Sequence, residues 1–260
     1  MNIIFTKLTT KRPLKDFLLA VSFLTRIPIP SALKFESELM SAAWSFSLIG
    51  ALLGFFCGSI AWVLVYLDLP TIMVAFLTTG SMVLLTGGLH EDGLADMTDG
   101  FGGGKSADEK ITIMRDSQIG TYGTLSLIFM LGLKITAIDT ILNNDTILVC
   151  IISLVISGAL SRLFMVPVAF WFENASKTGL GQFAGKPTLN SIVTPLVIIT
   201  LLSLLLMPIL KLIIIIILCV LTAIVIGKLS KQQIGGYTGD ILGATQVVSE
   251  VVILIYLATY

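Results

Sequence analysis

Long uncharged runs of apolar residues dominate the chain, and charged positions interrupt them at only a few places. A helix needs roughly 20 apolar residues to cross about 30 Å of hydrocarbon. Seven runs of about that length predict seven transmembrane helices, at residues 44–67, 69–88, 120–142, 146–171, 190–209, 212–227 and 241–259. Such runs exclude a β-barrel, whose strands alternate over about ten residues. The pattern predicts an all-α, polytopic membrane helical bundle that forms a single domain over residues 1–260.

The composition agrees with a membrane protein rather than a soluble globular domain. Of the 260 residues, 55% are hydrophobic and 12% are charged, and the mean hydropathy is +0.99. Soluble domains carry about 25% charged residues. The formal net charge is zero and no basic cluster is present, so we expect no nucleic-acid partner. Three cysteines lie inside apolar runs without metal-ligand spacing and are expected to be core residues: Cys57, Cys150 and Cys219.

Lysine and arginine residues fall almost entirely in alternate connections between the apolar runs. Thirteen of them lie before the first run or after the second, fourth and sixth, whereas only Lys211 lies in a connection on the other side. Positively charged connections tend to stay in the cytoplasm. We therefore expect a multi-pass protein of the bacterial cytoplasmic (inner) membrane, with segment 1–40 in the cytoplasm and Tyr260 outside. Within that segment, the apolar residues 17–30 suggest a segment at the membrane interface, although one that dips into the bilayer is also open.

The densest group of polar residues is GGLHEDGLADMTDGFGGG at residues 87–104, in an expected cytoplasmic loop at 87–119. Four carboxylates fall within nine residues of it: Glu91, Asp92, Asp96 and Asp99. Mg²⁺ prefers carboxylate oxygens and is often shared with substrate phosphates. The segment is therefore the candidate active site. If it is helical, its three aspartates share one stripe, whereas the interspersed glycines also allow a looped segment.

Two features beside the carboxylates bear on substrate binding. Glycine lets backbone N–H groups approach a ligand closely, as phosphate cradles require, so Gly102 and Gly103 are candidate substrate contacts. His90, the one histidine of the chain, could orient a carboxylate, bind a phosphate, or act as an acid or base. An ordinary polar residue at the membrane interface explains His90 equally well.

The spacing Asp96-x-x-Asp99-Gly100 resembles the start of the signature of CDP-alcohol phosphotransferases, which use metal-bound aspartates. The rest of that signature is missing, because Gly103 and Gly104 stand where Ala-Arg is expected. A phosphotransferase of that type, acting on lipid, is one alternative function. A cation transporter is another, since intramembrane carboxylates also bind ions. However, most carboxylates here gather in one segment, and no internal repeat is visible.

A closer resemblance covers most of the chain. HEDGLADMTDG at 90–100 resembles the acidic signature of the cobalamin synthase family, adenosylcobinamide-GDP ribazoletransferase. FLTRIPIP at 23–30 is similar to the N-terminal element of that family, and MRDSQIGTYG at 114–123 to its second polar motif. LSR at 160–162 resembles its buried arginine, and GGYTGDILGATQVVSE at 235–250 its C-terminal motif. Several motifs in the same order are more specific than any one of them.

The resemblance implies a reaction and a cofactor. A hydroxyl of α-ribazole, or of α-ribazole 5′-phosphate, attacks the cobinamide-side phosphorus of adenosylcobinamide-GDP, and GMP leaves. The family uses a divalent metal, usually Mg²⁺. For this chemistry we expect Asp92, Asp96 and Asp99 to bind Mg²⁺, with Glu91 as a further ligand or as the general base. Catalytic roles are accordingly expected for Glu91, Asp92, His90 and Arg115.

Two arginines are candidates for binding phosphate. Arg115 could form a bidentate clamp, or it could be an anchor at the membrane surface paired with Asp116, itself a candidate substrate contact. Arg162 lies well inside the fourth apolar run, where a charge is usually functional or paired. It could bind a phosphate or a carboxylate, or it could belong to a structural ion pair.

The C-terminal motif adds candidates on the last predicted helix. Asp240 at its cytoplasmic end is expected to contact the metal or the ribazole. Gly236 belongs to a glycine-rich turn before that helix and is a candidate substrate contact, although a plain turn explains it equally well. Glu250 lies deeper in the membrane and could pair with Arg162 or with Lys134. The sequence leaves the oligomeric state open.

Overall fold

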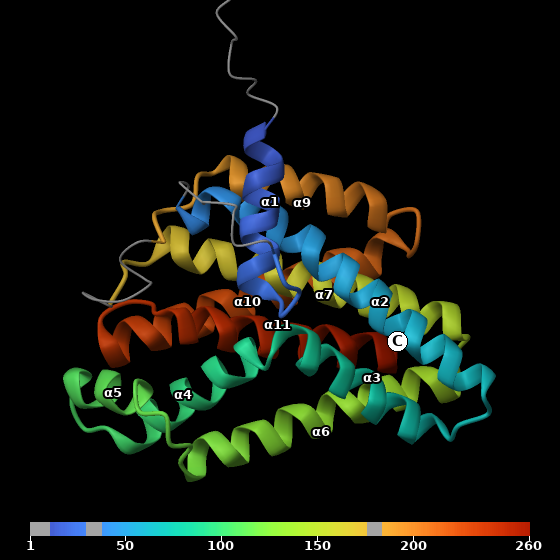
Figure 1. Cartoon of the computed structure of the whole chain (residues 1–260), viewed down its shortest axis with the longest axis horizontal. Helices are drawn as coiled ribbons and strands as arrows, with labels where there is room; N and C mark the ends of the chain where they lie inside the picture. The colour runs from blue at the N-terminus through green and yellow to red at the C-terminus, as the bar shows by residue number, and fades with distance from the viewer. Residues whose placement is uncertain (1–10, 30–37, 176–183) are drawn as a thin grey trace, which may run out of the picture.

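The computed structural model describes residues 11–29, 38–175 and 184–260 (Figure 1). Residues 1–10 and 30–37 of the expected N-terminal segment lie outside this part. The described residues are helical apart from turns and one isolated bridge. The elements are α1 (Lys11–Leu24), η1 (Leu39–Ser45), α2 (Phe46–Tyr66), α3 (Thr71–Thr86), α4 (Leu89–Gly103), α5 (Ala107–Met114), α6 (Thr121–Asn144), α7 (Ile147–Trp171), α9 (Asn190–Ser203), α10 (Ile209–Ile234) and α11 (Gly239–Thr259).

The expected all-α, polytopic fold is confirmed. Among the described residues, five helices are long and apolar enough to cross a membrane: Leu39–Tyr66, Thr121–Asn144, Ile147–Trp171, Ile209–Ile234 and Gly239–Thr259. The count differs from the expected seven at two places. The run at 190–209 forms only the 14-residue helix α9, because the chain turns after Ser203 and Pro208 begins a new helix. The run at 69–88 forms the 16-residue helix α3, which bends into α4.

The break between α3 and α4 positions the acidic segment. Gly87 and Gly88 both adopt left-handed conformations, with φ of 68° and 71°, and the two helices meet at 88°. Glycine adopts this conformation without steric penalty. The expected cytoplasmic segment at 87–119 consists mainly of α4 and α5, joined by a short turn, and its place in the cytoplasm stays a prediction. Helix α4 carries five ionisable side chains in 15 residues, and it passes as part of a membrane span only together with α3, as one bent pair.

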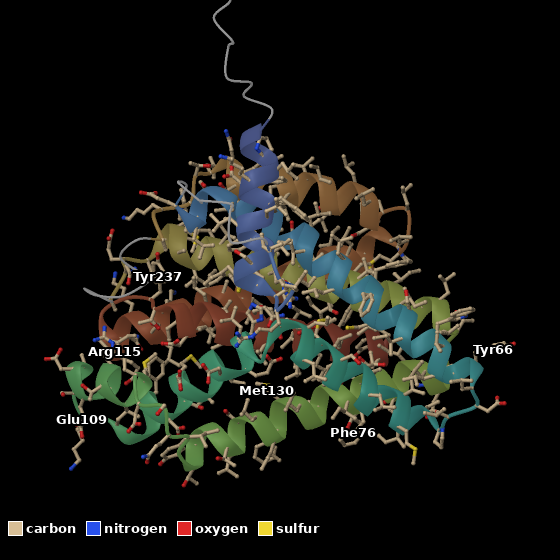
Figure 2. All side chains as sticks on the ribbon, in the orientation of Figure 1. Tyr66, Phe76, Glu109, Arg115, Met130 and Tyr237 are labelled. Carbon is tan, nitrogen blue, oxygen red and sulfur yellow. The ribbon has the colours of Figure 1, made fainter. Side chains whose placement is uncertain are left out.

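The long helices run side by side, so their ends gather at two opposite ends of the bundle (Figure 1). One end holds α5, the N-termini of α6 and α11, and the C-termini of α7 and α10; Glu109, Arg115 and Tyr237 lie there, and Tyr66 lies at the other end (Figure 2). This is the common face that the distribution of positive residues predicts for the acidic segment and the 235–240 turn. Helix α1 runs across the direction of the long helices, and its place at the membrane interface stays a prediction.

A stripe of glycines joins α2 to α7, one of the two most buried spanning helices. Gly50, Gly54 and Gly58 recur every four residues and face the α7 backbone, where a Cβ added at Gly50 would lie 1.9 Å from the Gly158 carbonyl oxygen. Small residues at this spacing allow membrane helices to approach closely. The contact fixes α7, and with it Arg162, in the centre of the bundle.

Replacing Gly50 with Ala is expected to destabilise the protein, because backbone atoms opposite the new methyl group have no room to move. Overpacking costs about 1–3 kcal/mol, and we expect the upper end of that range. Unfolding can be followed with a thiol-reactive dye, since all three cysteines are buried. Gly132→Ala in α6 is the matched control, because no atom lies within 4 Å of an added Cβ there. Equal unfolding midpoints for the two variants would contradict the close α2–α7 contact.

Candidate active site

Helix α4 carries the four carboxylates of the acidic segment, which confirms the helical alternative for the aspartate spacing. Their surroundings differ. Glu91 and Asp99 are buried, Asp96 is half-buried, and Asp92 is exposed. His90, in the first turn of the helix, is also buried. Asp92 and Asp96 are therefore accessible at the surface of α4, whereas Glu91 and Asp99 are enclosed in the bundle.

Two glycines bring α4 against the start of α11. A Cβ added at Gly93 would lie 2.9 Å from the Asp240 carbonyl oxygen, and one added at Gly243 would lie 3.2 Å from the His90 carbonyl oxygen. Thr238 caps α11: its Oγ1 accepts a hydrogen bond from the Ile241 N–H at 3.4 Å and donates one to Asp240 Oδ2 at 3.1 Å. The structure thus places Asp240 beside the aspartates of α4, although the two segments lie far apart in the sequence.

The aspartates form an excess of negative charge. Partial burial, together with the charges of Asp92, Asp240 and Asp99, raises the pKa of Asp96 from 3.8 to about 7. The positive charge of Arg115, the residue after α5, also acts on Asp240. A cation placed among these carboxylates would relieve their mutual repulsion.

The donor set fits Mg²⁺, although no three His, Cys, Asp or Glu side chains within the described ranges already converge on a ready-made metal site. Mg²⁺ usually keeps several waters and binds through one or two carboxylates together with substrate phosphates, rather than in an all-protein cage. Asp92, Asp96 and Asp240 supply carboxylate oxygens whose charges act on one another. The substrate that the sequence resemblance implies carries phosphates that would complete such a site.

Asp99 occupies a different position from the other aspartates. Its Oδ2 accepts a hydrogen bond from the Gly120 N–H at 2.7 Å, and its Oδ1 accepts one from the Gly123 N–H at 2.8 Å. Both amides belong to the start of α6. This contact ties α4 to α6 and is not predicted from the sequence. A metal-binding role for Asp99 stays a prediction, to which the contact offers an alternative.

The three glycines expected to contact substrate lie against protein atoms. A Cβ added at Gly102 would lie 2.5 Å from the Tyr122 ring, and one added at Gly103 would lie 3.3 Å from Ile113. Gly236 lies against the Glu173 carbonyl oxygen, 2.1 Å from an added Cβ, next to the bridge between Asn174 and Tyr237. Each glycine therefore has a packing role, and a contact with substrate stays a prediction.

Arg115 and Asp116 lie in the exposed segment between α5 and α6. Asp116 Oδ1 accepts a hydrogen bond from the Gln118 N–H at 3.1 Å, which forms a local turn. Lys110, one turn before Arg115, donates a hydrogen bond to Gln233 of α10. The segment is thus held near the ends of α10 and α11, where the aspartate cluster lies.

Three further polar side chains are buried in the bundle and lie close enough for their charges to interact: Arg162, Glu91 and His90. Arg162 is 1% exposed and donates from Nη1 to the Gly158 carbonyl oxygen at 3.2 Å, which confirms a buried arginine. The charge of Glu91 acts on it. Among the described residues, Arg162 Nε, Glu91 Oε2 and His90 Nε2 have no hydrogen-bond partner. Because buried polar groups rarely stay unpaired, these atoms are candidates for contact with substrate.

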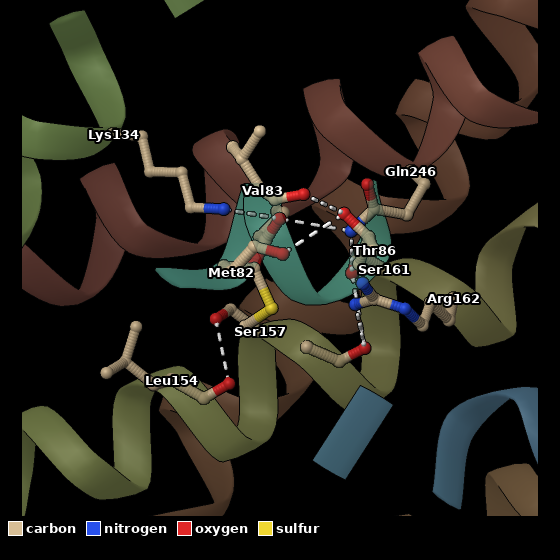
Figure 3. A network of polar contacts seen from close by, with 11 residues as sticks. Met82, Val83, Thr86, Lys134, Leu154, Ser157, Ser161, Arg162 and Gln246 are labelled. Carbon is tan, nitrogen blue, oxygen red and sulfur yellow. Dashed lines mark hydrogen bonds and ion pairs between the residues drawn. The ribbon is translucent and has the colours of Figure 1, made fainter. Parts of the chain in front are cut away.

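A buried ion pair joins α6 to α11, and its lysine, Lys134, belongs to a polar network with Ser161, Arg162 and Gln246 (Figure 3). Lys134 Nζ of α6 lies 2.9 Å from Glu250 Oε2 of α11, so of the two partners left open for Glu250 the structure selects Lys134. Gln246 Nε2 donates to Glu250 Oε2 and to Ser161 Oγ, both at 3.0 Å. Gln246 and Ser161 are not predicted from the sequence, because their uncharged side chains do not stand out in a polytopic helix.

Comparison with known proteins identifies the family. The family model described as cobalamin-5-phosphate synthase matches residues 16–258. The chain belongs to this family. Its relatives in the cobalamin-5-phosphate synthase family include proteins named adenosylcobinamide-GDP ribazoletransferase. The one from Shewanella frigidimarina is 36% identical over 92% of both chains, and the one from Bradyrhizobium diazoefficiens is 34% identical over 97% of this chain and 96% of its own.

A third relative with the same name, from Brucella anthropi, is 35% identical over 92% of this chain and 94% of its own. No solved structure matches the chain significantly. The matched region of the cobalamin-5-phosphate synthase family includes the acidic helix, Arg115, Arg162 and the start of α11. The resemblance inferred from the sequence motifs is therefore confirmed over nearly the whole chain.

Proposed function

We propose that the chain is an adenosylcobinamide-GDP ribazoletransferase that acts in the last stage of cobalamin biosynthesis. It joins adenosylcobinamide-GDP to α-ribazole, or to α-ribazole 5′-phosphate, and releases GMP. The observation that carries this proposal is the cluster of Asp92, Asp96 and Asp240 beside Arg115 at one end of a membrane bundle. Family membership over residues 16–258 favours this transfer over a CDP-alcohol phosphotransferase or a cation transporter.

Transfer of this kind depends on alignment and charge neutralisation more than on covalent chemistry by the protein. Asp92, Asp96 and Asp240 would hold Mg²⁺, with Glu91 as a further ligand predicted from the sequence. When bound, Mg²⁺ neutralises charge that builds up on phosphate oxygens. Arg115 holds phosphate oxygens through two parallel N–H donors, which fixes the phosphorus for attack.

The proton of the attacking ribazole hydroxyl goes to Glu91 or to His90. Both side chains lie in the first turn of α4, and Glu91 Oε2 and His90 Nε2 each have no partner within the described part of the chain. The hydroxyl oxygen forms a bond to the cobinamide-side phosphorus, the bond from that phosphorus to the bridging oxygen breaks, and GMP leaves with that oxygen. Arg162, behind Glu91, is a candidate partner for a phosphate or for the Glu91 carboxylate.

The direct test uses purified protein in liposomes with adenosylcobinamide-GDP and α-ribazole, in Mg²⁺ or in EDTA. We expect GMP and the joined corrinoid to appear in equal amounts, and only with Mg²⁺. Replacing α-ribazole with its 5′-phosphate then measures, from kcat/KM, which form is preferred. Absence of both products from folded protein would reject the function, and transfer from a CDP-alcohol to lipid would be assayed next.

We also infer that the site faces the cytoplasm of a bacterium, with Tyr260 on the outer side of the inner membrane. The bias of lysine and arginine to alternate connections of the sequence supports this orientation. Alkaline phosphatase fused after Tyr260 is expected to be active, because that enzyme matures outside the cytoplasm. The same reporter inserted between α4 and α5 is expected to be inactive, and the reverse result would overturn the orientation.

A further inference from the structure

Helix α6 begins without a cap of its own. The residue before a helix usually supplies a side-chain oxygen that accepts a hydrogen bond from an N–H in the first turn. Here that residue is Gly120, which has no side chain. Asp99, which lies 21 residues earlier on α4, supplies both oxygens, and these accept from the N–H groups of Gly120 and Gly123. A carboxylate at a helix N-terminus is also favoured by the helix dipole.

The two glycines are what allow the carboxylate to reach this position. A Cβ added at Gly120 would lie 2.5 Å from Asp99 Oδ1, and one added at Gly123 would lie 2.3 Å from Asp99 Oδ2. Asp99 is itself only 8% exposed. Next to it, Thr98 Oγ1 donates to Ser126 Oγ of α6 at 3.0 Å, so the two helices share a second polar contact. Asp99 is therefore enclosed at a helix junction.

This junction fixes one end of the segment that carries Arg115. The segment, residues 115–120, runs from the end of α5 to the first turn of α6. Its other end is fixed because Met114 packs against Gly100 of α4, where an added Cβ would lie 2.5 Å from the Met114 side chain. Both ends of segment 115–120 are thus attached to α4, one through Met114 on Gly100 and the other through Gly120 on Asp99. The distance between Arg115 and the aspartates depends on both attachments.

We propose that Asp99 is a positioning residue, which holds Arg115 at the phosphate-binding site by capping α6, and that it is not a Mg²⁺ ligand. The proposal rests on the proposed function for the role of Arg115. It separates Asp99 from Asp92 and Asp96, with which it shares a helical stripe. The proposal also explains why both positions of the QIGTYG motif, Gly120 and Gly123, are glycine: a side chain at either one would occupy the space of the Asp99 carboxylate.

The test compares Asp99→Asn with Asp96→Asn, Arg115→Ala and Gly120→Ala. Asparagine keeps one acceptor oxygen but places an NH₂ group against the second N–H, so the cap is lost in part. Gly120→Ala disturbs the same contact from the α6 side and leaves every carboxylate in place. Three readouts are measured: Mn²⁺ binding to substrate-free protein by electron paramagnetic resonance, hydrogen exchange of the backbone amides at 117–124, and KM for adenosylcobinamide-GDP.

We expect Asp99→Asn and Gly120→Ala to speed amide exchange at 117–124 and to raise KM about tenfold, as Arg115→Ala does. The Mn²⁺ affinity of Asp99→Asn and of Gly120→Ala should stay within about twofold of that of the unchanged protein. Asp96→Asn should weaken Mn²⁺ binding about tenfold or more. The double variant of Asp99→Asn and Arg115→Ala should have no higher KM than Arg115→Ala alone.

Loss of Mn²⁺ affinity in Asp99→Asn equal to that in Asp96→Asn would overturn the proposal, as would unchanged exchange in both cap variants. If Asp99→Asn does not fold, Gly120→Ala carries the same comparison with all four aspartates intact. The exchange and Mn²⁺ readouts need no substrate. A failure of the proposed transferase function would therefore appear as missing product in the unchanged protein, while the capping role would still be decided.

Discussion

Replacing Asp96 with Asn is expected to abolish ribazole transfer, by about 10³-fold or more, while the protein stays folded. Partial burial, together with the negative charges of Asp92 and Asp240, raises the pKa of Asp96 to about 7, so a nearby cation favours its ionised form. Asparagine removes one negative charge from a mutually repelling cluster, so stability should not fall. The expected result is loss of kcat with an unchanged or slightly higher unfolding midpoint.

The measurement pairs GMP release at saturating Mg²⁺ with the thiol-dye unfolding midpoint. Asp108→Asn is the matched control, because Asp108 is an exposed acidic residue in the first turn of the neighbouring helix α5. Its replacement changes the local charge by the same amount and should leave turnover within about twofold. If Asp96→Asn turned over at near the unchanged rate, Asp96 would not belong to the site that neutralises the phosphates.

The spanning helices could be predicted because uncharged runs of about 20 residues leave few alternatives. The break at Gly87 and Gly88 could not, since glycine density is compatible with a turn, a kink or a phosphate cradle, and only tertiary packing decides among them. Here two successive left-handed residues end α3 and direct α4 along α11. Similarly, α9 is hydrophobic enough for a span but too short, because the chain turns after Ser203.

The candidate site, too, could be predicted from the sequence only in part. The spacing of the aspartates predicts a common stripe, which α4 confirms, but the period of a helix does not say what each residue on the stripe meets. Asp99 meets amide groups of Gly120 and Gly123, and this contact depends on how α6 packs against α4. Asp240 reaches the cluster because Gly93 and Gly243 let α4 and α11 approach closely.

Charges within apolar runs were the strongest sequence signal in the interior. They indicated that Lys134, Arg162 and Glu250 need partners, and the structure pairs Lys134 with Glu250. The choice could not be made from the sequence, because it depends on the relative rotation of α6, α7 and α11. Gln246 and Ser161 complete the group from positions that carry no charge.

Replacing Glu250 with Gln is expected to destabilise the protein strongly, by about 3–5 kcal/mol. Glu250 and Lys134 are 2% and 3% exposed, and Arg162 is buried close enough for its charge to act on Glu250. Loss of the carboxylate leaves Lys134 and Arg162 as two buried cations near each other. The thiol-dye assay should show a much lower unfolding midpoint, together with reduced extraction of folded protein from membranes.

Removing the lysine as well is expected to restore most of the stability. In the double variant of Lys134→Met and Glu250→Gln, the methionine fills the space of the lysine stem and the glutamine can still bond to Gln246. Replacing a buried ion pair with neutral groups of similar volume is often close to neutral, whereas breaking it is not. A double variant no more stable than Glu250→Gln would contradict this account, because it would mean that Lys134 makes no unfavourable contribution once its partner is lost. Recovery would show instead that the pair holds α6 to α11 through charge balance, which in turn keeps Asp240 beside the aspartates of α4.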